Sequence, residues 1–123
     1  MLKRGFKVYL AEANALIETV SVADLDWLLD QPNTVLVDVR ETVEREAGMI
    51  PGSVHAPRGM LEFQADPESP AHNAALDPEK RLVLYCGTGG RSALAARTLL
   101  DMGFPSVASL AGGYAAWQTA RKK

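Results

Sequence analysis

Apolar residues along this chain fall into short runs that polar segments separate. Two runs, Val35–Val39 and Leu82–Tyr85, are apolar almost throughout, which is typical of strands buried on both faces of a parallel sheet. Shorter segments at Glu18–Ser21, Ser53–Ala56 and Val107–Leu110 lie between turn and helix signals and predict further strands. The pattern therefore predicts about five short strands, mostly parallel.

Helix signals alternate with these strands. Ser21 and Asp24 form a capping pair at the start of one helix, and Gly103 follows another as a left-handed stop. The helices that we expect are Leu10–Ile17, Val22–Asp30, Glu41–Ala47, Gly59–Ala65, Arg91–Met102 and Gly113–Arg121. The polar, proline-rich stretch 66–80 is expected to be a loop. Alternating strands and helices predict an α/β fold with helices on both faces of the sheet.

Composition narrows the class of protein. The chain has 123 residues, 47% of them hydrophobic, so we expect a single domain over residues 1–123 with its core at about 18–120. A net charge of −2 provides no basic field for nucleic acid or a membrane surface. No apolar run approaches the ~20 residues of a membrane span. Lys7 and Glu12 interrupt the N-terminal apolar stretch, which we interpret as mature sequence rather than a signal peptide.

The segment LVLYCGTGGRS carries the clearest candidate for chemistry. Cys86 stands where the apolar strand ends, and it is the only cysteine, which fits a reducing, cytoplasmic compartment. The residues that follow it are Gly87, Thr88, Gly89, Gly90, Arg91 and Ser92. Glycines let backbone amides turn inward, and the first turn of a helix carries partial positive charge. Such a loop can hold an anion next to the thiol.

A free thiol has a pKa of about 8.5, so only ~3% of it is thiolate at pH 7. The loop amides, the charge of Arg91 and the hydroxyls of Thr88 and Ser92 should all lower that pKa. We therefore interpret Cys86 as an activated nucleophile in an exposed loop. The alternative is a buried structural cysteine in front of a glycine turn.

Asp38 and Arg40 follow the other apolar strand. If the two strands are parallel, their carboxyl ends share one edge of the sheet, where ligands of open α/β sheets bind. Arg40 is then a candidate for binding an anionic donor, and Asp38 a candidate for orienting Arg40 or the loop amides. The alternatives are that Asp38 caps the next helix and that Arg40 forms a surface ion pair.

Metals and cofactors are not expected. His55 and His72 lie far apart without metal-ligand spacing, and both are interpreted as ordinary histidines. Gly112 and Gly113 are interpreted as a strand-to-helix turn.

Four segments, in this order, resemble the single-domain rhodaneses, a thiosulfate sulfurtransferase-like family. The segments are LVDVRE (36–41), GMIPGSVHAP (48–57), YCGTGGRS (85–92) and LAGGYAAW (110–117). Met49 stands where histidine is common in the family. The resemblance implies a twisted, mostly parallel sheet of about five strands flanked by helices. It also implies that Cys86 takes up a sulfane sulfur as a persulfide, which the loop amides stabilise, while Arg91 helps to bind the donor.

The resemblance further implies a small donor such as thiosulfate and an acceptor such as cyanide, a thiol or a partner protein. Two other readings stay open. A phosphatase or arsenate reductase of the related cell-cycle type also uses a cysteine loop that ends in arginine, although that loop is longer. A rhodanese-like module that carries sulfur or binds a protein is the second alternative.

Overall fold

A computed structural model gives the positions of residues 1–122. They form one five-stranded sheet in which every neighbouring pair of strands is parallel. The strands are β1 (Glu18–Val20), β2 (Thr34–Asp38), β3 (Val54–His55), β4 (Arg81–Tyr85) and β5 (Val107–Leu110). Their order across the sheet is β1-β5-β4-β2-β3. The predicted parallel α/β fold is therefore confirmed.

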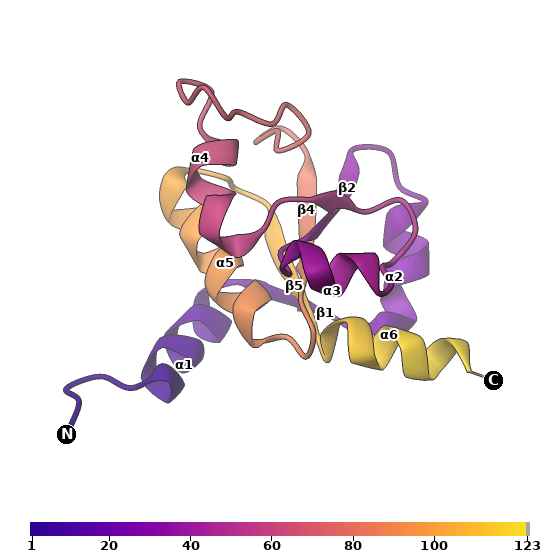
Figure 1. Cartoon of the computed structure of the whole chain (residues 1–123), viewed down its shortest axis with the longest axis horizontal. Coiled ribbons are helices and arrows are strands. Elements are labelled where there is room, and N and C mark those ends of the chain that lie inside the picture. Colours follow the sequence, from indigo (N-terminus) through magenta and orange to yellow (C-terminus); the bar gives the residue numbers. More distant parts are fainter. Residues whose placement is uncertain (123) are drawn as a thin grey trace.

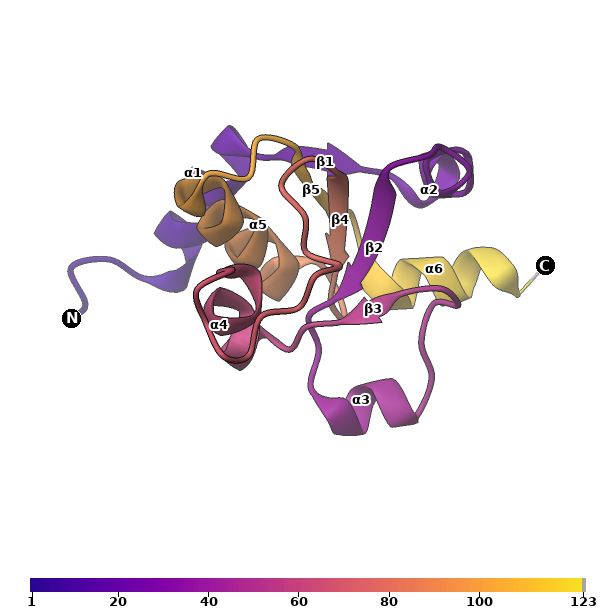
Figure 2. The ribbon, with the colours of Figure 1, turned by 90° about the horizontal axis from the view of Figure 1, so that it is seen from above.

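Helices cover both faces of this sheet (Figure 1). On one face lie α1 (Phe6–Leu16), α4 (Leu61–Ala65) and α5 (Gly90–Met102), and on the other lie α2 (Val22–Leu29) and α6 (Gly113–Arg121) (Figure 2). The connection before β3 contains α3 (Thr42–Glu46), and the connection after β3 contains the short 3-10 helix η1 (Arg58–Met60). Segment 66–80 forms turns without a helix, as expected for its proline-rich sequence.

The core has two parts, one on each side of the sheet. Alternate side chains of a strand point to opposite faces, so Leu82 and Leu84 pack with Leu99 of α5, whereas Val83 and Tyr85 pack with Leu25 of α2. This two-sided burial explains why β4 is apolar at almost every position.

Helix α1 begins at Phe6, four positions before the predicted start at Leu10. Phe6, Val8 and Tyr9 are exposed apolar residues, so the first turns of α1 lack the apolar stripe that reveals a helix in the sequence. The helix nevertheless packs against α5, with Ala13 fully buried.

The alignment of β2 with β4 brings the candidate residues together. Asp38 pairs with Tyr85 in the strand register, and the Val39 amide donates to the Tyr85 carbonyl at 3.0 Å. Both strands therefore end at the same edge of the sheet, where Arg40 and Cys86 begin the connecting loops.

Candidate active site

Cys86 lies at the carboxyl end of β4 and points into the turn that follows. Its side chain is buried, with 1% of the residue exposed, whereas Thr88 at the tip of the same loop is exposed. The Gly89 amide donates to Sγ at 3.1 Å and the Ser92 amide at 3.4 Å. The loop thus wraps its backbone donors around the sulfur.

Glycine is required at two positions of this arrangement. Gly89 is the N-cap of α5 and has φ of 112°, in the region that favours glycine. Gly113 has φ of 58°, and a Cβ there would lie 2.5 Å from the Cys86 carbonyl oxygen and 2.8 Å from the carbonyl carbon of Gly87. The interpretation of Gly113 as a simple turn residue therefore missed its contact with the cysteine loop.

The N-terminus of α6 holds the outer side of the same loop. The Tyr114 amide donates to the Cys86 carbonyl at 2.8 Å, and the Ala115 amide donates to the Gly87 carbonyl at 3.0 Å. In a trans peptide the carbonyl and the next amide point in opposite directions. With its carbonyl bonded to α6, the Gly87–Thr88 peptide turns the Thr88 amide to the opposite side, where it contributes to lowering the pKa of the Cys86 thiol.

These contacts lower the pKa of the Cys86 thiol. Burial by itself raises that pKa, but the hydroxyl and amide of Ser92 and the amides of Gly89 and Thr88 stabilise the thiolate more strongly. The Ser92 side chain is itself fixed, because its hydroxyl lies 2.8 Å from the hydroxyl of buried Ser109.

Arg91 lies beside the thiol but is already paired. Its two terminal nitrogens donate to the two carboxylate oxygens of Glu44 at 2.7 and 2.9 Å. A Cβ on Gly87 would meet Arg91 Nη2 at 3.2 Å, which places the guanidinium over the first residue of the loop. Glu44 is the main cause of the raised pKa of Arg91, and the Cys86 thiolate also contributes.

Asp38 and Arg40 form a buried ion pair next to this loop. Arg40 Nε and Nη2 donate to the two Asp38 carboxylate oxygens at 3.0 and 2.9 Å, and both residues are buried. Arg40 also donates to the Gly48 carbonyl at 2.7 Å and lies over the rings of Tyr85 and Tyr114. Because 3% of Arg40 is exposed, the structure favours a supporting role for Arg40 over direct contact with a donor.

Asp38 orients Arg40, as one of the two sequence interpretations predicted, and the pair is not at the surface. The next helix is capped by Glu41 rather than by Asp38. The Asp38 carboxylate also accepts from the Tyr85 hydroxyl at 3.0 Å and from Arg45 at 3.2 Å. Burial raises its pKa, but the hydrogen bonds from Arg40 and Tyr85 outweigh burial and lower it.

Comparison with known proteins identifies the family. The rhodanese-like domain model matches residues 21–120. The chain belongs to the rhodanese-like domain family. Human thiosulfate:glutathione sulfurtransferase is 33% identical over 105 residues, which cover 80% of this chain and 91% of that protein. A putative sulfur carrier protein of Bacillus subtilis is 35% identical over 117 residues, which cover 94% of this chain and 58% of that protein.

A solved structure is also similar to this rhodanese-like domain. It is a Rhodopseudomonas palustris protein of unknown function, described as a possible tyrosine phosphatase. The two chains are 45% identical with a TM-score of 0.93, and the match covers 98% of this chain and 94% of that one.

The rhodanese-like domain contains further residues at the site that the sequence interpretation did not single out. Glu44 and Arg45 lie on α3, and each bonds to a residue of the site from there. Tyr85 was assigned only to the strand, yet its hydroxyl links Asp38 to the Ile50 amide. His55 is half-buried, with Nε2 2.7 Å from the Arg40 carbonyl oxygen, whereas His72 is exposed.

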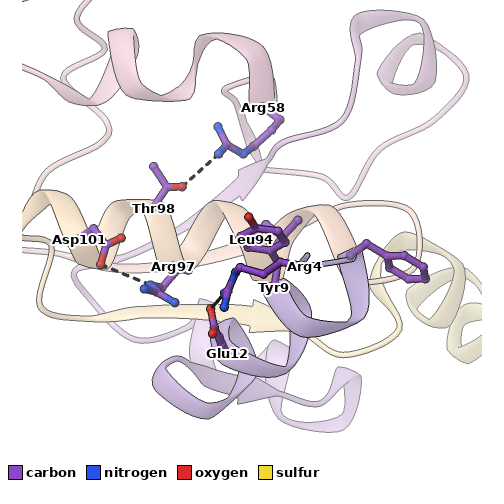
Figure 3. Close-up of a pocket in the computed structure, with 9 residues that line it drawn as sticks. Arg4, Tyr9, Glu12, Arg58, Leu94, Arg97, Thr98 and Asp101 are labelled. Atoms are coloured by element: carbon purple, nitrogen blue, oxygen red, sulfur yellow. Dashed lines mark hydrogen bonds and ion pairs between the residues drawn. The ribbon is translucent and has the colours of Figure 1, made fainter. Parts of the chain in front are cut away.

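Surface hollows of the rhodanese-like domain also lie outside the cysteine loop. Within residues 1–122, no cluster of metal-ligating side chains occurs and no helix is long and apolar enough to cross a membrane. A surface hollow of about 500 Å³ lies between α1 and α5 (Figure 3). Each of its arginines has a carboxylate partner, and the pairs are Arg4–Glu12, Arg58–Glu62 and Arg97–Asp101. In the described part of the chain, the hollow contains no cysteine and no ring of inward-facing backbone amides, so the cysteine loop is the candidate site.

Proposed function

We propose that this chain is a sulfurtransferase that moves a sulfane sulfur through a persulfide on Cys86. The observation that carries the proposal is the ring of backbone amides around a buried thiol whose pKa is lowered. A thiolate in such a cradle is a nucleophile, and a persulfide anion fits the same donors after the sulfur has been added. The relationship to sulfurtransferases and a sulfur carrier supports this reading.

The first half of the reaction loads the cysteine. The Cys86 thiolate attacks the outer sulfur of thiosulfate, a bond forms between the two sulfurs, and the sulfur–sulfur bond of the donor breaks. Sulfite leaves with the bonding electron pair, the thiolate's electron pair forms the new sulfur–sulfur bond, and the outer sulfur keeps its own negative charge in the persulfide. Thr88, Gly89 and Ser92 stabilise that charge through their amides, and Arg91 attracts the anionic donor.

The second half transfers the sulfur to an acceptor. A nucleophile such as cyanide, a small thiol or a thiol of a partner protein attacks the outer sulfur of the persulfide and releases the Cys86 thiolate. The two halves share one covalent intermediate, so ping-pong kinetics are expected. A single reduced cysteine must persist for this cycle, which suits the cytoplasm.

Intact mass spectrometry tests the proposal directly. After incubation with thiosulfate, the mass should rise by about 32 Da, one sulfur atom, and cyanide should remove the gain. Since Cys86 is the only cysteine, the Cys86→Ser variant should show no gain while keeping its fold, because a serine hydroxyl can use the same amide donors. A gain that persists in Cys86→Ser would contradict the mechanism.

The similarity to a protein described as a possible tyrosine phosphatase favours one second candidate, phosphoester hydrolysis by the same thiol. Only four residues separate Cys86 from Arg91, so the loop encloses little space for a tetrahedral phosphate. We therefore expect no turnover of aryl phosphates by a preparation that forms the persulfide. Turnover of an aryl phosphate without a sulfur-dependent mass gain would favour the phosphatase.

A further inference from the structure

Glu44 of α3 occupies the charged end of Arg91. The two side chains come from positions 47 residues apart, and they form a two-point pair at 2.7 and 2.9 Å. Paired carboxylate and guanidinium groups of this geometry are the strongest form of exposed ion pair. The pair lies at the surface of the site, with 43% of the Arg91 side chain and 34% of the Glu44 side chain exposed.

Glu44 is also held on its own helix. Its Oε1 accepts from the Glu41 amide at 2.9 Å, so the carboxylate reaches Arg91 from a fixed position in the first turn of α3. The hydrogen bond from Arg91, followed by that from the Glu41 backbone, lowers the pKa of Glu44 to about 2. The carboxylate is therefore charged at every pH at which the enzyme would work.

Any oxyanion that approaches Cys86 meets this pair. Arg91 lies over Gly87, and after Glu44 the Cys86 thiolate also contributes to the raised pKa of Arg91. The guanidinium is therefore placed to receive the anionic end of a donor. The Nη1 and Nη2 end, which binds a carboxylate or sulfonate at two points, is taken by Glu44. An oxyanion must displace Glu44 or bind to a guanidinium whose charge is already balanced.

We infer that Glu44 is a specificity-determining residue that competes with the oxyanion of a donor for Arg91. The inference rests on the proposed sulfurtransferase function. Glu44 disfavours doubly charged donors such as thiosulfate and favours persulfides of simple uncharged thiols, which carry at most one negative charge. With a persulfide donor, the Cys86 thiolate attacks the outer sulfur and forms the new sulfur–sulfur bond. The donor's own sulfur–sulfur bond breaks, and the rest of the donor leaves as a thiolate with the bonding electron pair. The outer sulfur, now on Cys86, keeps its proton or its negative charge.

The test measures the rate of persulfide formation on Cys86 by mass spectrometry, with each donor in excess and no acceptor. The donors are thiosulfate and the persulfide of 2-mercaptoethanol at equal ionic strength. Glu44→Gln removes the charge but keeps an oxygen for the Glu41 amide, as a glutamine does in a capping box. The variant should react with thiosulfate on the order of tenfold faster. It should gain only about threefold with the singly charged donor, because the Coulomb energy scales with charge.

Glu46→Gln is the matched control. It removes the same charge from the same helix, and Glu46 forms no ion pair with any of residues 1–122. Its rate constants should stay within about twofold of the parent for both donors. An unchanged thiosulfate rate in Glu44→Gln, or an equal gain for both donors, would overturn the inference.

The Arg91→Ala background separates competition from a general field. Once Arg91 is absent, Glu44→Gln should change the thiosulfate rate by less than about twofold, because only screened repulsion remains. A gain of the same size in both backgrounds would overturn the competition. If no donor loads sulfur on Cys86 in the parent chain, it is the proposed function that fails, whereas loading without the Glu44 effect refutes this inference alone.

Discussion

Replacing Asp38 by asparagine should destabilise the domain by about 3–5 kcal/mol, the cost of removing one partner from a buried ion pair. Asp38 is fully buried and Arg40 is 3% exposed. The substitution keeps the size of the side chain, so it leaves the packing nearly unchanged. What it removes is the charge that balances the Arg40 guanidinium in the interior.

The contacts of Asp38 show why asparagine cannot replace it. One carboxylate oxygen accepts from the Arg40 amide and Nε, and an asparagine oxygen can keep both bonds. The other oxygen accepts from Arg40 Nη2, Arg45 Nη1 and the Tyr85 hydroxyl. An asparagine NH₂ group at that position is itself a donor, so it cannot accept these three hydrogen bonds. A loss of this size is a large part of the 5–15 kcal/mol that stabilises a typical domain.

Urea unfolding at pH 7 measures the free-energy difference, with Asp26→Asn as the matched control. Asp26 forms an ion pair with Arg121, but both side chains are more than half exposed, so its loss should cost less than about 1 kcal/mol. The lowered pKa of Asp38 means that its contribution is present above the ordinary aspartate pKa of about 3.9 and is lost as the pH falls below that value. An Asp38→Asn loss no greater than that of Asp26→Asn would refute the reasoning.

Two further predictions concern the cysteine loop. The rate of Cys86 alkylation by iodoacetamide should reach half its maximum below pH 8.5, about the pKa of a free thiol, because the loop amides lower the pKa. A midpoint at or above that pH would show that burial raises the pKa more than the amides lower it. Gly113→Ala should slow persulfide formation at least about tenfold, because the new Cβ meets the Cys86 and Gly87 carbonyl groups and shifts the loop. Gly103→Ala is its control, since Gly103 also has positive φ but open space around it; equal slowing in both variants would assign the effect to general destabilisation.

Much of this fold was predictable because its elements are defined locally. The buried runs at β2 and β4 predicted those strands to within one residue at each end. Ser21 caps one helix through its side-chain hydroxyl, and Gly103 ends another with a left-handed backbone. The position of Cys86 between a buried strand and a glycine-rich loop was also predictable from the sequence. Its burial was not, because the exposure of a side chain depends on what packs over it.

The remaining parts of the site depend on contacts between distant segments. Glu44 looked like one charge in a polar helix, and its pairing with Arg91 exists only because the fold brings α3 next to the first turn of α5. The role of Gly113 depends on α6 meeting that loop. A pattern within one segment carries no signal for such contacts. Only the expectation that the two apolar strands are parallel indicated that Arg40 and Cys86 share an edge, and the register of β2 with β4 agrees with it.

The hydrogen bonds between the cysteine loop and the N-terminus of α6 affect the electrostatic environment of the Cys86 sulfur. The Ala115 amide polarises the Gly87 carbonyl, and hydrogen bonds along such a chain strengthen one another. The Thr88 amide of the same peptide then becomes a better donor to the thiolate. One peptide group therefore transmits the partial positive charge at the N-terminus of α6 to the Cys86 sulfur. The dipoles of the loop and of α6 are already oriented toward the sulfur before a negative charge forms there. Cys86 can therefore change between thiolate and persulfide without a rearrangement of the surrounding groups.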